Sequence, residues 1–352
     1  MKKWLIKTLV SLSKPNLYVE VSVMPKEIYI GFSSHRLEAI PFYQKVFNQN
    51  DFIILEDAPN PFLIPVLKKE LSLEQYSQRL ETDFPKFIEA QFRLLQKAYQ
   101  DGKEITQIDP YMEKLIQIYQ LLERGKKGQE IAHLPEFREV YTAEHNATGR
   151  LLDYYQATMG TFEQAVEAIK AFAHADAQRI ALRDKMRAEK IAQYLQNKRG
   201  RVFIEAGYIH LFLSSFLRKL IPLDWNLKAS FLLASVGRQI AKSIIGKSLP
   251  YPLVPGDILT FWYIGRRKNN PEKEKLFAAQ VLIYNRLITT EELEPTPEVP
   301  YPHLKQEFEI KAMLKKLSYL DCSRLYSLIK FLPPEKAWAL VKKFICVKKN
   351  SD

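Results

Sequence analysis

The chain has 352 residues, of which 47% are hydrophobic and 26% charged, values that are ordinary for a globular protein. This length allows one large domain with an appendage, or two domains. Lys7 interrupts the apolar stretch that follows the basic first residues, and no small-residue cleavage site comes after it, so we expect no export signal. The two cysteines, Cys322 and Cys346, should then stay reduced in the cytoplasm, which argues against a disulfide framework.

The formal charge of +12 is concentrated in the C-terminal part of the chain. Lys and Arg outnumber Asp and Glu by 24 to 14 in residues 201–352, but only by 28 to 26 in residues 1–200. The basic residues lack the glycine-rich and aromatic signatures of nucleic-acid binding, so we expect no nucleic-acid partner. A solvated basic face and a peripheral contact with a membrane both stay open. No apolar run approaches the roughly 20 residues that span a bilayer, so we expect no transmembrane segment.

Strand-like segments come first along the chain. Residues 18–24 and 27–31 alternate in polarity around a turn at Pro25, and residues 51–57 form a compact apolar run that ends in two carboxylates. Ser72 and Gln75 then have the spacing of a capping box, which predicts a helical stretch that lasts until Gly102. A short strand is predicted next, at residues 105–109.

Helices dominate the following hundred residues, with predicted segments at 111–124, at 135–155 and from Thr161 to about Gly200. A strand at 201–207 follows directly, and helix resumes at 210–218. Strands separated by helices pair in parallel through crossover connections. We therefore predict an α/β fold, with a mainly parallel sheet flanked by helices and a helical C-terminal extension. Its functional residues should lie at the carboxyl ends of the strands.

The predicted domain organisation has four parts. The α/β domain covers residues 1–222, a helical extension covers 223–290, a linker covers 291–304 and a small helical tail covers 305–352. The linker is predicted from the four prolines and four glutamates between Glu291 and Pro302. We expect residues 226–290 to be helical throughout.

Several polar residues stand where the predicted strands end. His35 follows Gly31, and His210 follows Gly207, in each case after a glycine that allows a tight turn at the end of a strand. Four carboxylates have similar positions: Glu56, Asp57, Asp109 and Glu205. Such a set could bind a metal, or act as acid and base around a water. A structural role stays open for each histidine, and a helix cap is favoured for the two aspartates, each close to a proline.

The order of these motifs resembles that of the TraB/Tiki/erythromycin-esterase-like superfamily, which includes ChaN-like proteins. The resemblance covers roughly residues 18–220. It consists of Gly31 to His35 after the first strand, Glu56 at the end of the next, an arginine-bearing segment at 182–191, and Gly207 to His210 after the last strand. The second glycine-x-x-histidine motif has the spacing of the superfamily, and the first has one residue more.

The resemblance implies the α/β fold and a choice of activities, since members look like metal-dependent peptidases, hydrolyse macrocyclic esters or bind haem. For this chain it implies a hydrolase of a peptide-like or ester substrate. His35, Glu56 and His210 would surround a water or a divalent metal, and Arg183 would bind the negative charge of the substrate, unless it only pairs with an acidic neighbour on its helix. Ligand or cofactor contacts would come from Gly31, Gly207 and Glu205. The alternative is a non-catalytic protein that binds haem or a peptide and uses its basic helical part to contact a partner or a membrane surface.

Overall fold

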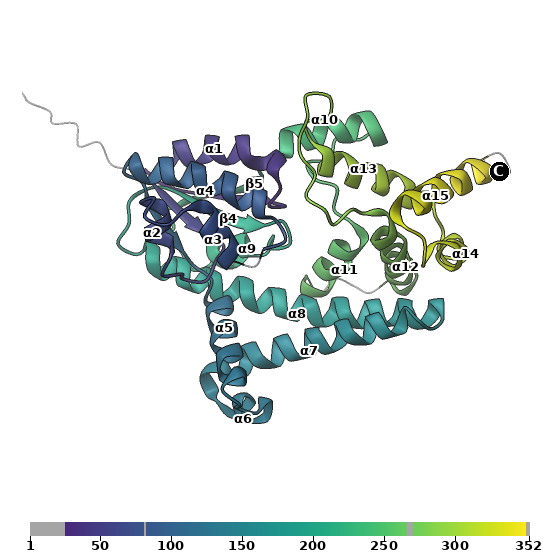
Figure 1. Ribbon diagram of the computed structural model, residues 1–352, viewed down its shortest axis with the longest axis horizontal. Helices are drawn as coiled ribbons and strands as arrows, with labels where there is room; N and C mark the ends of the chain where they lie inside the picture. Colours follow the sequence, from purple (N-terminus) through teal and green to yellow (C-terminus); the bar gives the residue numbers. More distant parts are fainter. Residues whose placement is uncertain (1–24, 81, 266–269, 350–352) are drawn as a thin grey trace, which may run out of the picture.

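The computed structural model describes residues 25–80, 82–265 and 270–349 (Figure 1). Within these residues, five strands form one parallel sheet in the order β3-β2-β4-β1-β5. The strands are β1 (Lys26–Ser33), β2 (Phe52–Leu55), β3 (Glu104–Gln107), β4 (Gly200–Gly207) and β5 (Asn226–Phe231). The predicted fold class, a parallel sheet flanked by helices, is confirmed. The strand predicted at residues 18–24 lies outside the described residues.

Both faces of the sheet are covered, which explains why the central strands are almost continuously apolar. Phe203 of β4 packs in a core on one face, and its neighbours Val202 and Ile204 pack in a second core on the other. The first face is covered by η1 (Leu37–Ala39), α1 (Ile40–Gln49), α2 (Leu63–Leu67), α3 (Leu73–Arg79), α4 (Pro85–Gln100) and α10 (Ala234–Ile245). The second face is covered by α9 (Leu213–Arg218) and by one half of α8 (Phe162–Leu195).

Helix α8 connects the sheet to the rest of the molecule, as Figure 1 shows. It begins at the capping box formed by Thr161 and Gln164, as predicted, and its 34 residues give it a length of about 50 Å. Its first half packs in a core of helices, and its second half packs under the sheet. The helices before it are α5 (Pro110–Glu123), α6 (Gly128–His133) and α7 (Pro135–Ala157), of which α7 lies along α8.

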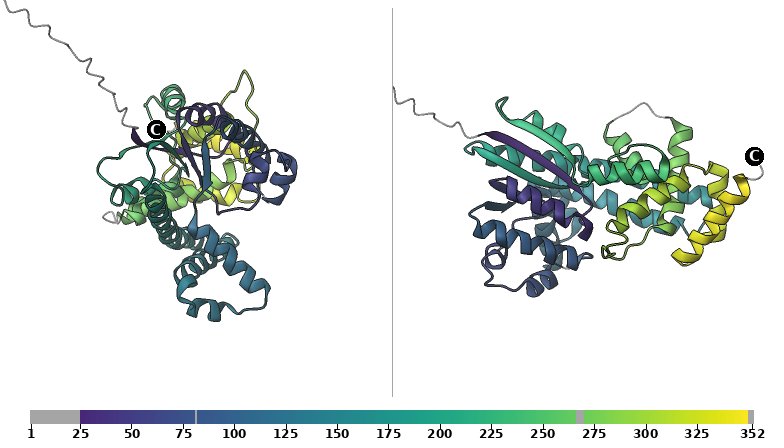
Figure 2. Two further views of the ribbon diagram at one scale, coloured as in Figure 1. Left: turned by 90° about the vertical axis from the view of Figure 1, so that its left-hand side faces the viewer. Right: turned by 90° about the horizontal axis from the view of Figure 1, so that it is seen from above.

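The C-terminal helices form a second lobe beside the sheet, visible from above in Figure 2. They are α11 (Pro255–Ile264), α12 (Pro271–Leu287), α13 (Pro302–Leu314), α14 (Tyr319–Ile329) and α15 (Pro334–Lys349). Most of their buried side chains share one core with α7 and the first half of α8. None of the helices in the described residues combines the length and the apolar character that crossing a bilayer requires.

The prediction that residues 226–290 are helical throughout is wrong for the first six of them. Asn226–Phe231 forms strand β5, which pairs with β1 at the edge of the sheet. Because an edge strand has only one neighbour and little burial, Leu227 is its one fully buried residue, and Asn226, Lys228 and Ser230 are exposed. The alternation that marks a half-buried strand is therefore missing from the sequence.

The segment predicted to be a linker contacts the α/β part of the molecule. Glu292 accepts hydrogen bonds from the backbone N–H groups of Lys86, at 3.1 Å, and Phe87, at 2.7 Å. In α13, Leu304 and Phe308 are buried in the same core as α1 and α4. Packing is therefore continuous between α13 and the sheet domain.

Candidate functional site

The carboxyl ends of β1, β2 and β4 lie side by side, because β4 pairs with both other strands. The residues that follow these strands therefore meet at one edge of the sheet. Oε2 of Glu56, Cδ2 of His210 and Cε1 of His35 all lie within 3.8 Å of the point where a Cβ on Gly207 would stand. The structure thus brings together the two histidines and the glutamate that the sequence singled out.

His210 is buried in this cluster, with 2% of its surface exposed. Its Nδ1 lies 2.5 Å from Oδ1 of Asp184 in α8, and its Nε2 lies 2.9 Å from Oε1 of Glu56. Burial disfavours the charged ring, but the carboxylates of Glu56 and Asp184 outweigh burial and raise the pKa of His210 to about 9. His210 is therefore an imidazolium that donates through both nitrogens, which leaves no free nitrogen for a metal or for proton transfer.

Two arginines on one face of α8 neutralise the acidic strand ends. Arg183 contacts Oδ2 of Asp109 through Nε, at 2.7 Å, and through Nη2, at 2.6 Å, and its Nη2 lies 3.1 Å from Oε1 of Glu56. Arg187 is fully buried and donates to the carbonyl oxygens of Glu205, at 2.9 Å, and Ile108, at 3.2 Å. Burial would favour a neutral Glu56, but His210 and the two arginines hold the pKa of its carboxyl well below the usual range.

Sequence reasoning missed part of this network. Arg187 follows Arg183 by one helical turn, and this spacing could have indicated that both lie on the same face of α8. The alternative prediction, that Arg183 pairs with an acidic residue of its own helix, is wrong, because its ion-pair partners are Asp109 and Glu56. Asp109 also caps α5 by accepting from the N–H of Met112, as predicted. The cap predicted for Asp57 is absent, because the next helix, α2, begins only at Leu63 and has no side-chain cap.

Glu205 faces the opposite side of the sheet edge and is held by neutral donors. Its Oε1 accepts from the hydroxyl of Tyr43, at 2.9 Å, and from the side-chain amide of Gln91, at 2.5 Å, and its Oε2 accepts from the N–H of Glu56, at 3.4 Å. Burial and then the nearby charge of Glu205 raise the pKa of Tyr43 well above its usual value, so this hydroxyl stays a donor. Neither Tyr43 nor Gln91 stood out in the sequence.

His35 lies beside Glu205 and has an unsatisfied nitrogen. Its Nε2 is 3.6 Å from Oε1 of Glu205, and this nitrogen is buried without a hydrogen-bond partner. The residue has a φ of 52°, in the left-handed region that only a few per cent of non-glycine residues adopt. Such backbone strain is concentrated at functional sites.

A cavity of about 290 Å³ opens in front of these groups. It joins charged residues from the strand ends and α8 to apolar residues at the start of α4. The residues that line it are His35, Glu56, Asp57, Thr82, Phe84, Phe87, Ile88, Gln91, Arg183 and Glu205. We call it the strand-end pocket. Its volume lies at the lower end of the range for small-molecule sites, which suits a small ligand or one end of a larger one.

The two glycines predicted to contact a ligand have different positions. Gly31 lies inside β1, where a Cβ would come within 2.6 Å of the ring of Phe203 and 2.7 Å of Leu232. The lack of a side chain at Gly31 is therefore explained by this close packing. Gly207 lies at the centre of the cluster and donates its N–H to Glu56.

The metal site predicted from His35, Glu56 and His210 is not formed either. In the part of the chain that the structure describes, no group of three or more His, Cys, Asp or Glu side chains is arranged to hold a metal ion. The physical reason is that Glu56 is turned toward His210 and the two arginines, which use the oxygens that a metal would need.

Comparisons with known proteins give a relative and no family. A protein of Archaeoglobus fulgidus, described as an uncharacterized protein, is 24% identical over 299 residues, which are 84% of this chain and 97% of that protein. No family model matches the chain. No solved structure matches it. A match of this length is too long to be confined to one of the two lobes.

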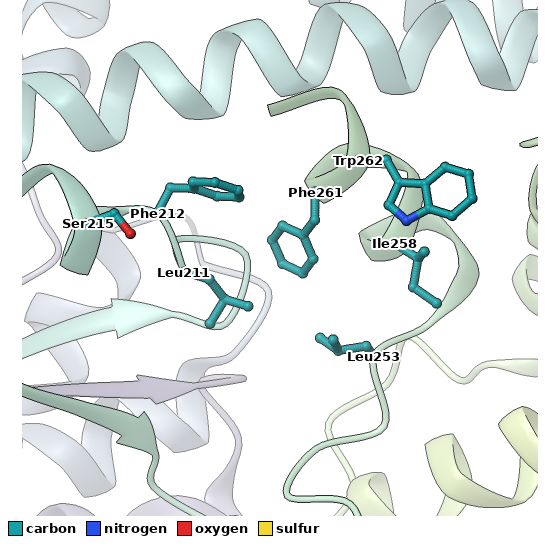
Figure 3. Close-up of a pocket in the computed structure, with 7 residues that line it drawn as sticks. All are labelled: Leu211, Phe212, Ser215, Leu253, Ile258, Phe261 and Trp262. Atoms are coloured by element: carbon teal, nitrogen blue, oxygen red, sulfur yellow. The ribbon is translucent and has the colours of Figure 1, made fainter. Parts of the chain in front are cut away.

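A second cavity, of about 430 Å³, lies between the two lobes (Figure 3). Leu211, Phe212 and Ser215 contribute to it from the segment after His210, and Leu253, Ile258, Phe261 and Trp262 contribute from α11 and the loop before it. Ser215 is the only lining residue with a hydroxyl group. No histidine, cysteine, methionine or tyrosine lines this cavity, so it offers no side chain of the kinds that ligate haem iron.

Proposed function

We propose that this protein is a hydrolase that acts on a small peptide-like or ester substrate in the strand-end pocket. The observation that carries the proposal is the buried, unpartnered Nε2 of His35, which lines the pocket 3.6 Å from the carboxylate of Glu205. An imidazole beside a carboxylate is a recurrent general base, and a nitrogen that lacks a partner is available to a water or a substrate.

The roles of the residues follow from their positions. His35 accepts a proton from a water, whose oxygen forms a bond with the carbonyl carbon of the substrate, and Glu205 stabilises the resulting imidazolium. The bond to the leaving amine or alcohol then breaks, and His35 returns the proton to that group. Arg183 lines the same pocket, and its Nη1 makes no hydrogen bond within the described residues, so it can stabilise the oxyanion. Glu56 and His210 position Arg183 and close the site from behind.

The test compares His35→Ala with wild type on a panel of p-nitrophenyl esters and dipeptide amides. Loss of a general base should lower kcat by about 10² to 10⁴-fold, with little change in melting temperature, because the side chain is partly exposed. His145→Ala is the matched control, since His145 is exposed and stacks only on Tyr141. Turnover that is equal in His35→Ala and wild type would refute the proposal.

The alternative is a non-catalytic protein that binds its ligand in the same pocket. Saturable binding of a dipeptide amide by wild type, without hydrolysis over many hours, would favour it. Neither proposal depends on a metal.

A further inference from the structure

The charges around the strand-end pocket are unevenly matched. Behind the pocket, the three cations Arg183, Arg187 and His210 are paired with three carboxylates, those of Glu56, Asp109 and Asp184. Each of these groups lies within 4.0 Å of an opposite charge, so this inner network is balanced.

Two carboxylates of the pocket form no ion pair with an arginine or lysine in the described part of the chain. The carboxylate of Glu205 accepts from the neutral groups of Tyr43 and Gln91, and among the described residues the ring of His35 is the only basic group within 4 Å of it. Asp57 forms no ion pair with any described residue, although it lines the same cavity. Burying a carboxylate without a cation costs several kcal/mol, and the side chain of Glu205 is only 5% exposed. The pocket therefore has negative charge that a ligand can neutralise.

The walls of the pocket indicate what kind of cation fits. Phe84, Phe87 and Ile88 line the same cavity as the carboxylates. Aromatic faces attract an organic ammonium group, and apolar carbons accept its skeleton. A metal ion needs oxygen or nitrogen ligands in place of these walls. Arg36 stacks over Phe84, 4.0 Å from the ring, but forms no ion pair with either carboxylate in the described part of the chain.

We propose that Glu205 and Asp57 bind the free ammonium group of the substrate, so that the substrates are α-amino acyl amides or esters with an unblocked amino group. This inference names the substrate class for the proposed hydrolase and rests on it. Glu205 and Arg183 line the same cavity of about 290 Å³, so the proposal assigns the α-ammonium group to Glu205 and the adjacent carbonyl group to Arg183.

The test measures binding by calorimetry with L-leucinol, which has the amine and no bond to hydrolyse, and with N-acetyl-L-leucinol. Leucinol should bind at least about tenfold more tightly, since charge-assisted hydrogen bonds to an ammonium group are lost on acetylation. Asp57→Asn should reduce this preference, and Glu205→Gln should abolish it. Asp101→Asn, an exposed aspartate that does not line the pocket, is the matched control.

Equal binding of the two compounds would overturn the inference, as would stoichiometric binding of Mn²⁺ or Zn²⁺ that displaces leucinol. Hydrolysis assays separate this inference from the proposed function. Hydrolysis of free and N-acetylated leucine p-nitrophenyl esters at equal rates would retain the hydrolase and reject the ammonium site. Amine-selective binding without any hydrolysis would retain the ammonium site and reject the hydrolase.

Discussion

His210 makes the folding stability of the protein depend on pH. In an unfolded chain a histidine titrates near 6.5. In the folded protein burial lowers the pKa, but the carboxylates of Glu56 and Asp184 outweigh burial and raise it to about 9. Because the folded state binds the proton more tightly, this stabilisation is complete below about pH 6.5 and is lost as the pH rises through 9. Its size is on the order of 3 kcal/mol.

Chemical denaturation of wild type and of His210→Gln at pH 6.5 and 9.5 measures this contribution. Wild type should lose stability between the two pH values, and the variant should lose less, since its side chain does not titrate. His145→Gln, which removes an exposed ring, should follow wild type. The same pH dependence in His210→Gln and wild type would show that the ring does not hold its proton between the two carboxylates.

Arg187 should be among the least replaceable residues. Arg187→Met removes a fully buried charge and leaves the carbonyl oxygens of Glu205 and Ile108 without their donor. Breaking a buried charge network typically costs about 3 to 5 kcal/mol in the free energy of unfolding. Lys185→Met on the same helix, where the lysine is 60% exposed, should change it by less than about 0.5 kcal/mol. A variant at position 187 as stable as wild type would contradict the network described for the site.

The structure brings His35, Glu56 and His210 together as the sequence predicts, but it leaves His210 without the free nitrogen that the predicted role needs. The site could be predicted because His35, Glu56 and His210 each follow a strand, and the carboxyl ends of parallel strands share one edge. The sequence could not predict that His210 has no free nitrogen, because one nitrogen is bound by Asp184, which lies in α8, 26 residues earlier. Tertiary packing decides which face of α8 lies against His210.

At the scale of elements, strand prediction succeeded where packing left a pattern in the sequence. β2 and β4 are buried on both faces and read as apolar runs, so their positions followed from composition. β5 has no such run because it lies at the sheet edge, and its polar residues are exposed. The contact between α13 and the sheet was also missed, since the prolines before α13 predict a turn and carry no information about what the turn packs against.

Helix α13 is fixed to the sheet domain by Glu38 of η1. The Glu38 carboxylate accepts from the N–H of His303, at 3.0 Å, and of Leu304, at 2.9 Å, in the first turn of the helix. Backbone N–H groups in the first turn of a helix have no partner within the helix, and Glu38, which is 3% exposed, accepts from two of them. Glu38→Ala should therefore cost about 2 kcal/mol in the free energy of unfolding.

Hydrogen exchange provides the measurement for this cap. Burial raises the pKa of Glu38 to about 7, so the comparison is best made at pH 8, where the carboxylate is ionised. In Glu38→Ala the amides of residues 303 and 304 should exchange faster, and in the control Glu309→Ala, later in α13, they should not. Unchanged protection in Glu38→Ala would mean that packing alone holds this end of the helix.

At the scale of the whole molecule, α8 and α13 join the core of the helical lobe to the two cores on the faces of the sheet. The first half of α8 and most of α13 belong to the helical core, and the second half of α8 and Phe308 of α13 belong to the cores around the sheet. An element shared by two cores couples their unfolding, because neither core can open without exposing apolar surface in the other. We expect the two lobes to melt in a single transition.

Removing residues 305–352 should therefore prevent the sheet domain from folding cooperatively. The deletion removes Phe308, which is fully buried in the core on the first face of the sheet, and it removes helices that pack on α12. Phe308→Ala is the milder test and should cost about 3 to 5 kcal/mol. Calorimetry of the full chain, of Phe308→Ala and of residues 1–304 gives the answer. A soluble fragment 1–304 with a sharp melting transition near that of the full chain would show that the sheet domain is independent of α13.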